Sequence, residues 1–232
     1  MGQRIMIVAV HQPQYLPWLG YFDKIDKADI FVLLDTVQFK KNEWQNRNKI
    51  KSAQGWQWLT VPVLYQYPQL INEVTINSTV NWQHKHRQAL VSNYKRAPYF
   101  EMLEEFLEDI FSSSWQFISQ LNIEVVKRLV RVMGIGTPLY VASELGEFPQ
   151  DPDERLVAIT KYFGSGTYLA GIGGRGYMNL DTYTKNGIKV IFQDFKHPVY
   201  HQLFGDFEPF MSVIDLICNH GDKSLTILRG ET

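Results

Sequence analysis

The stretch IMIVAVHQPQYLPWLGYFDKIDKADIFVLLD, residues 5–35, decides the fold class of this chain. Its apolar runs 5–10 and 29–35 have the length and continuity of buried strands. Between them, residues 18–28 repeat apolar side chains at helical spacing. Strand, helix and strand form a β-α-β unit, whose short crossover favours parallel strands with a right-handed connection. The opening of the sequence therefore predicts a parallel sheet.

The same alternation of strand and helix continues along the chain. Further strands are predicted at 138–143, 167–172 and 189–195. The helix that follows Asp151 has a strong start signal, with Asp151 as N-cap and a proline at the first helical position. Strands that alternate with helices predict the α/β class, with a mainly parallel sheet flanked by helices.

The middle of the chain interrupts this pattern. Residues 56–63 and 72–76 alternate polar and apolar side chains around a turn-like segment, which indicates a β-hairpin insertion. Residues 82–134 then show helical periodicity throughout. We expect one domain over residues 1–232, in which 82–134 is a helical insertion or subdomain.

Bulk composition limits the possible functions. The 232 residues are 45% hydrophobic and 20% charged, as in globular proteins of one large or two small domains. A formal charge of -1 argues against a general nucleic-acid binder. No apolar window approaches the roughly 20 residues of a membrane helix, and no signal peptide is expected. The single cysteine, Cys218, lies in an apolar run and is interpreted as a buried hydrophobe. A cytoplasmic location is predicted.

The loop HQPQYLP, residues 11–17, follows the first predicted strand. Its two prolines stiffen the backbone, and ligands of open parallel sheets bind at the carboxyl ends of the strands. We therefore predict His11 as a catalytic base, Gln12 as a substrate contact and Tyr15 as a stacking group. The alternative is a hydrophobic plug, in which Tyr15 and Trp18 only cover the edge of the sheet.

The densest polar stretch, TVQFKKNEWQNRNKIK, spans residues 36–51 and follows Asp35 at the end of the second strand. Arg47 offers a planar fork for carboxylate or phosphate oxygens, and Trp44 offers a face for a base or sugar ring. A solvated basic surface is the alternative. Asp35 is a candidate catalytic residue, and the predicted substrate contacts are Gln38, Lys41, Trp44, Asn46 and Arg47.

Several long blocks carry a family resemblance. HQPQYLPWLGYFDKI, DIFVLLDTVQFKKNEWQNRNKIK, WLTVPV, WQHKH and HPVYHQLFGDFEPFMSVIDLICNHG together resemble the WbqC-like family from about residue 6 to residue 221. The resemblance implies a role in making or modifying activated sugars for O-antigen or other bacterial surface polysaccharides. A looser likeness is to nucleotidyltransferases with a His-x-Gly-His signature after the first strand. Only His11 matches that signature, since no second histidine follows.

The last third of the chain adds further candidates. His197 and Tyr200 follow the predicted strand 189–195, so His197 is a second candidate base and Tyr200 a substrate contact. Asp215 and Asn219 stand four apart on the final helix, where they either contact substrate or form a structural pair.

Two other motifs carry weaker signals. The turn GIGGRG, residues 171–176, lacks the lysine and hydroxyl residue of a P-loop, so a flexible loop and a phosphate cradle both remain open. His84 and His86 are two apart on a helix and point away from each other, so no metal site is expected.

These residues predict a cytoplasmic transferase that acts on a nucleotide-linked or otherwise phosphate-bearing sugar, without a cofactor. In this interpretation, His11, Asp35 and His197 lie at the same edge of the sheet. The substrate is a small molecule, and nucleic acid is not the expected partner. Two alternatives stay open: a non-catalytic binding module for a sugar or single-stranded RNA, and a structural subunit that depends on a co-encoded partner.

Overall fold

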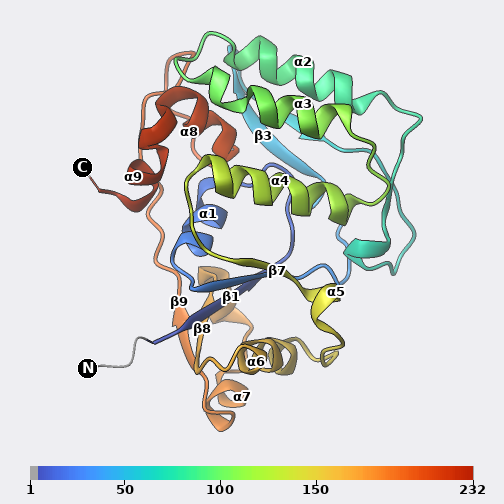
Figure 1. Ribbon diagram of the computed structural model, residues 1–232, viewed down its shortest axis with the longest axis vertical. Helices are drawn as coiled ribbons and strands as arrows, with labels where there is room; N and C mark the ends of the chain where they lie inside the picture. The colour runs from blue at the N-terminus through green and yellow to red at the C-terminus, as the bar shows by residue number, and fades with distance from the viewer. Residues whose placement is uncertain (1–4, 232) are drawn as a thin grey trace. The chain divides into compact units, whose positions relative to one another are not determined.

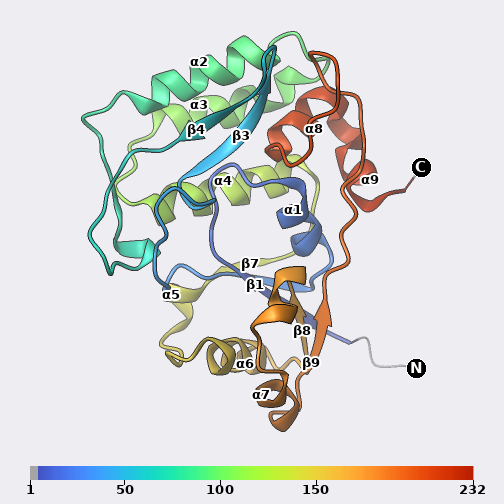
Figure 2. The same ribbon diagram turned by 180° about the vertical axis from the view of Figure 1, so that it is seen from behind.

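The computed structural model describes residues 5–231 and confirms the α/β class. The described chain forms two compact units. The sheet unit comprises residues 5–12, 23–34 and 136–196, and the hairpin unit comprises residues 13–22, 35–135 and 197–231. Figure 1 shows both, and Figure 2 shows them from behind.

The sheet unit contains a five-stranded sheet in the order β7-β2-β1-β8-β9. All neighbouring strands pair in parallel, which confirms the predicted parallel sheet. The central strand is fully apolar and buried at Val8, Ala9 and Val10, as expected for a strand covered on both faces. The strands are β1 (Ile7–His11), β2 (Ile30–Leu33), β7 (Leu139–Val141), β8 (Thr167–Ala170) and β9 (Lys189–Phe192).

Short helices connect these strands. Asp151 caps α6 as predicted, because its carboxylate accepts the backbone N–H groups of Asp153 and Glu154. Helices α6 and α7 pack against each other and against β8 and β9, respectively (Figure 1). The connecting elements are α1 (Leu19–Asp26), which begins in the hairpin unit, α5 (Ala142–Leu145), α6 (Pro152–Tyr162), η3 (Ile172–Gly176) and α7 (Leu180–Lys185).

The strand order creates a topological switch point between β1 and β8. From β1 the chain builds outward to β2 and β7 on one side, and then returns to add β8 and β9 on the other side. In open parallel sheets, loops at such a point diverge and leave a crevice at the carboxyl ends of the strands. Here those loops begin directly after His11 and directly after Ala170.

The main hairpin of the hairpin unit is formed by β3 (Arg47–Ser52) and β4 (Gly55–Thr60). A hairpin was predicted between 56–63 and 72–76, and this pairing is confirmed only at the end of the first segment, because residues 55–60 pair with β3. Only β5 (Val63–Leu64) and β6 (Thr75–Ile76) pair in that way. The partner β3 was missed because its turn, Ala53–Gln54, lacks the Asn-Gly or Asp-Gly signal of tight hairpins.

Helices make up most of the rest of the hairpin unit. In α4, Leu121, Val125 and Leu129 are buried at helical spacing. Helix α3 packs against both α2 and α4 (Figures 1 and 2). The elements are η1 (Ile71–Glu73), α2 (Trp82–Tyr94), η2 (Phe100–Leu103), α3 (Glu104–Ser112), α4 (Ile118–Val132), α8 (Val213–His220), η4 (Gly221–Lys223) and α9 (Ser224–Arg229). Within residues 5–231, no helix has the length and apolar character that a membrane span requires.

Candidate functional site

His11 is the last residue of β1, at the switch point of the sheet unit. It pairs across the sheet with Leu33, and its carbonyl accepts the backbone N–H of Leu34 at 2.8 Å. Its ring Nδ1 lies 3.2 Å from the carbonyl oxygen of Gln12. Since a carbonyl only accepts hydrogen bonds, Nδ1 carries the proton and Nε2 is the acceptor nitrogen of the ring.

Lys24 is the second ionisable group of the sheet unit at this place. Its side chain extends from α1, is only 3% exposed, and donates from Nζ to the Val10 carbonyl at 2.8 Å. Burial lowers the pKa of Lys24 to about 7. Burial, and then the neighbouring charge of Lys24, lower the pKa of His11 to about 3. We call these two residues the strand-end pair, and such strongly shifted pairs are typical of functional sites.

Lys24 was not predicted as a site residue. Lys24 stands three residues after Tyr21 and one before Ile25, on a helix whose residues 19–25 are all buried.

The glycine-rich turn η3 follows β8 on the other side of the switch point. A side chain at Gly174 would place Cβ 2.6 Å from Met178 Sδ, so this position requires glycine or a shift of Met178. Arg175 is exposed, and its guanidinium lies 4.9 Å from the ring centroid of Phe192. The turn therefore presents one guanidinium beside the end of β9.

Tyr15, from the stiff loop, is fully buried in the hairpin unit. Its hydroxyl lies 2.8 Å from Nδ1 of His86, and its backbone N–H donates to the Trp44 carbonyl at 3.0 Å. Burial raises the pKa of Tyr15 and lowers the pKa of His86 to about 4. Gln12, which precedes this part of the loop, belongs to the sheet unit and is half-buried.

The amide side chains of the polar stretch bind backbone groups of their own unit. Asn46 donates to the Val61 carbonyl at 3.0 Å and accepts the backbone N–H of Asn42 at 2.9 Å. Asn48 donates to the Leu16 carbonyl at 2.8 Å. These hydrogen bonds fix the shape of the loop before β3.

Three further residues predicted from this stretch have different surroundings, although Asp35 and Gln38 both lie against residues 70–72. The Asp35 side chain is buried, and its carbonyl accepts the backbone N–H of Asn72 at 3.1 Å. Gln38 is exposed and forms an isolated bridge with Leu70. Lys41 is exposed in the turn before β3.

Tryptophans and cations gather on one face of the β3–β4 hairpin, which we call the hairpin face. Arg47 lies over the Trp58 ring at 4.3 Å from its centroid, and Lys49 lies over the Trp56 ring at 4.0 Å. Trp44 reaches the same group, with its ring centroid 5.9 Å from that of Trp58. Of the five members, only Trp44 and Arg47 were predicted as substrate contacts.

The period of the strands explains this grouping. Arg47 and Lys49 are two apart on β3, and Trp56 and Trp58 are two apart on β4, so each pair projects from one side. Lys49 pairs directly with Trp58, which brings the two sets to the same side of the hairpin. Ile50 projects from the opposite side and is fully buried.

His197 lies among aromatic rings of the hairpin unit. It stacks between Trp18 and Tyr200, with centroids 6.4 Å and 6.5 Å away. Its Nδ1 donates to the Pro198 carbonyl at 2.8 Å, and its Nε2 accepts the backbone N–H of Phe210 at 3.1 Å. Partial burial lowers the pKa of His197. The ring therefore fixes the path of residues 197–210.

Asp215 and Asn219 share the buried face of α8. Burial raises the pKa of Asp215 to about 6, and the nearby Tyr200 and Tyr94 hydroxyl groups partly offset this effect. Asn219 donates to the Asp215 carbonyl at 2.7 Å, within the same helix. The structure thus brings His197, Tyr200 and Asp215 into one cluster at the C-terminal end of the chain.

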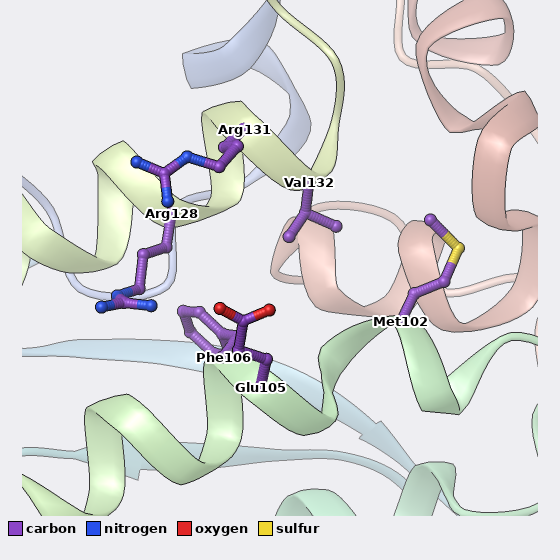
Figure 3. Close-up of a pocket in the computed structure, with 6 residues that line it drawn as sticks. All are labelled: Met102, Glu105, Phe106, Arg128, Arg131 and Val132. Carbon is purple, nitrogen blue, oxygen red and sulfur yellow. The ribbon is translucent and has the colours of Figure 1, made fainter.

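A surface pocket between α3 and α4 contains none of the predicted residues. Figure 3 shows Arg128 and Arg131 on α4, with Glu105 and Phe106 on α3. Its empty volume, which includes open solvent, is about 320 Å³. Arg128 already pairs with Asp109 and with Glu124, so its charge is compensated within the protein.

The described residues contain no cluster of three or more metal-binding side chains.

Comparison with known proteins identifies the family. The WbqC-like protein family matches residues 12–227. The chain belongs to the WbqC-like protein family. This WbqC-like chain is also 34% identical over 226 residues to the "Uncharacterized protein Rv1507c" of Mycobacterium tuberculosis (strain ATCC 25618 / H37Rv), covering 96% of this chain and 97% of that protein. No solved structure matches it. The predicted family membership is confirmed.

Proposed function

We propose that this WbqC-like protein is a transferase that acts on a nucleotide-linked or otherwise phosphate-bearing sugar at the switch point of its sheet unit. The observation that carries the proposal is the strand-end pair, because it places two strongly perturbed ionisable groups beside the carboxyl end of the central strand. Family membership supports a polysaccharide-associated role.

The two members of the pair have different tasks in this proposal. His11 stays uncharged at physiological pH because its pKa is about 3, and its Nε2 accepts a hydrogen bond from the attacking hydroxyl or amine of the sugar. Lys24, with a pKa of about 7, is the member that exchanges a proton near neutrality. Arg175 in the glycine-rich turn supplies a guanidinium for a phosphate oxygen.

Calorimetric titration with UDP-, GDP-, dTDP- and CMP-linked sugars tests the proposal. We expect one of them to bind the wild type, and His11→Asn to fold normally while failing to restore polysaccharide synthesis in a deletion strain. Lys189→Gln is the matched control, since Lys189 is exposed on β9 of the same unit. A folded His11→Asn variant that restores normal polysaccharide would remove His11 from the site.

The hairpin face favours a second candidate function, a non-catalytic binding module. Exposed aromatic rings interleaved with cations also fit a sugar or single-stranded RNA. If no nucleotide-linked sugar binds the wild type and oligo-uridine does, the binding module replaces the transferase.

A further inference from the structure

The hairpin face is an exposed surface built from five side chains of one unit. Trp44, Trp56 and Trp58 are 36%, 41% and 36% exposed. Large aromatic side chains normally bury most of their area. Three exposed indoles in mutual contact, at 5.6 Å and 5.9 Å between centroids, form a contiguous aromatic surface and not scattered single residues.

The cations of this face have no acidic partner in the part of the chain that the structure describes. Neither Arg47 nor Lys49 forms an ion pair there. Both instead lie over indole rings, at 4.3 Å and 4.0 Å from the centroids. A cation over an aromatic ring keeps its charge while its side chain is held in place. The face therefore presents two positioned positive charges to solvent.

The placement of Arg47 and Lys49 along β3 favours a ligand that carries more than one negative charge. Residues two apart on a strand are separated by roughly 6.8 Å along the strand. Arg47 and Lys49 have this backbone spacing on β3, and both side chains reach the Trp58 ring, with Arg47 Cζ 4.3 Å and Lys49 Nζ 5.3 Å from its centroid. One small anion would be contacted best by two cations that converge on it, whereas a chain of anionic units meets cations placed in a row.

The rings are arranged for a thick, non-planar ligand. Trp56 and Trp58 meet at 81°, and Trp44 and Trp58 meet at 47°, so the indoles form corners and not parallel slots. The Arg47 and Lys49 side chains already cover one face each of Trp58 and Trp56. Sugar C–H groups contact the negative faces of aromatic rings, and rings that meet at a large angle can contact one thick sugar ring together, whereas a flat nucleobase stacks on only one of them.

The loop that carries Trp44 is held before any ligand arrives. Gln45 accepts the backbone N–H of Lys40 at 2.7 Å, and Asn46 accepts that of Asn42 at 2.9 Å. Asn122 donates to the Gln45 carbonyl at 2.7 Å. A surface ordered in advance loses less conformational entropy when it binds.

We infer that the hairpin face binds an acidic oligosaccharide, with sugar rings against Trp44, Trp56 and Trp58 and carboxylates on Arg47 and Lys49. The inference goes beyond the proposed transferase, because it uses only residues of the hairpin unit, and it deepens the second candidate function by naming the ligand class. It assigns this WbqC-like protein a glycan-binding surface whether or not the sheet unit binds a nucleotide-linked sugar.

Calorimetric titration of the full chain with a galacturonic acid tetrasaccharide tests the inference. The control ligand is the methyl ester of the same tetrasaccharide, which keeps the rings and removes the charges. We expect the acid to bind about tenfold more tightly than the ester, and its binding to weaken with added salt. Equal affinity for acid and ester would overturn the assignment of carboxylates to the two cations.

Variants then locate the binding surface. Arg47→Gln and Lys49→Gln should each weaken binding of the tetrasaccharide about tenfold, and Trp56→Ala should do the same by removing a ring contact. Lys40→Gln, an exposed lysine of the same loop, is the matched control and should change affinity less than about twofold. Unchanged thermal unfolding will show that each variant is folded.

Two results would overturn the inference. Loss of binding in Lys40→Gln equal to that in Arg47→Gln would show bulk charge attraction without a built site. Tighter binding of oligo-uridine than of the tetrasaccharide, with the same variants affected, would make the face a nucleic-acid surface. Titration with nucleotide-linked sugars, run on the same variants, reports on the sheet unit separately.

Discussion

The strand-end pair and the hairpin face handle their cations in opposite ways. Lys24 is 3% exposed and donates to a backbone carbonyl of its own unit. Arg47 and Lys49 lie on a solvent-facing surface, over indole rings. A buried lysine tends to give up its charge, and so becomes able to exchange protons near neutrality. A cation over an exposed indole keeps its charge, and so is able to attract anions.

The two arrangements also differ in their cost to stability. Burying a charged lysine costs several kcal/mol unless the group loses its proton. A cation–π contact at an exposed site stabilises by only about 0.5–1 kcal/mol. Substitutions in the sheet unit should therefore move the free energy of unfolding more than those on the hairpin face. They should also change its dependence on pH.

The largest effect is expected from Lys24→Met. Lys24 has a pKa of about 7 in the folded protein against 10.5 for the unperturbed group. The unfolded state therefore binds more protons between these values, and the contribution of Lys24 to stability rises with pH across this window. Methionine removes the cost that is present in full below pH 7. At pH 6 we expect a gain of about 4 kcal/mol in the free energy of unfolding, allowing about 1 kcal/mol for the lost hydrogen bond.

Urea denaturation at pH 6, 8 and 10 measures this difference, which should shrink as the pH rises. Lys189→Met is the control, because Lys189 is exposed in the same unit and should give a pH-independent change near zero. A constant difference between Lys24→Met and the wild type at all three pH values would show that Lys24 is charged and tolerated in the fold.

His11→Gln should have the next largest effect on the free energy of unfolding, and this effect is expected at acid pH. The pKa of His11 is lowered from 6.5 to about 3, so the unfolded state binds an extra proton between these values. Stability is therefore lost as the pH falls through this window, and glutamine abolishes that loss. His11 is only half-buried, so the full effect of the shift is not expected. Between pH 7 and pH 4, the free energy of unfolding should fall by about 2 kcal/mol less in the variant than in the wild type.

His84→Gln provides the comparison, since His84 is exposed on α2. Its acid-unfolding curve should coincide with that of the wild type. If His11→Gln also unfolds like the wild type between pH 7 and pH 4, the ring of His11 is not desolvated as the structure indicates.

Most of the fold could be predicted because its decisive segments have unambiguous patterns. Residues 5–10 and 30–34 are short, continuous apolar runs rich in β-branched residues, as is typical of strands buried in a parallel sheet. The cap at Asp151 is specified by local hydrogen bonding alone. In contrast, β3 is rich in polar and charged residues and its turn has no typical turn pair, so only its pairing with β4 shows that it is a strand.

The candidate sites were less predictable because they depend on tertiary context. Trp44 and Arg47 stood out in the polar stretch, and whether they contact substrate stays a prediction. Trp56 and Trp58 were interpreted only as strand residues, although two tryptophans at a spacing of two indicate a common face. Lys24 was missed because helix lysines usually reach solvent, and only the elements packed around α1 bury it.

On the hairpin face, Trp58→Ala is expected to lower the free energy of unfolding by about 2 kcal/mol. The ring is 36% exposed, so it buries less area than a core aromatic residue, but it contacts both other indoles. Thr60→Ala, on the same side of β4, should cost less than about 0.5 kcal/mol. Chemical denaturation at pH 7 compares the two variants, and a cost near 4 kcal/mol for Trp58→Ala would place the ring in the core.

The smallest effect is the coupling between Arg47 and Trp58, and it tests the comparison most directly. A double-mutant cycle with Arg47→Gln and Trp58→Leu removes first the charge, then the aromatic ring, then both. We expect a coupling energy of about 0.5–1 kcal/mol, because the guanidinium lies 4.3 Å from the ring centroid at a partly exposed site.

The same cycle with Lys40→Gln in place of Arg47→Gln should give a coupling energy near zero, since no contact joins that exposed lysine to Trp58 among the described ring and cation contacts. Zero coupling for Arg47 would mean that the indole does not position the cation. Arg47 would then be an ordinary solvated charge, and the contrast with Lys24 would reduce to a difference in exposure.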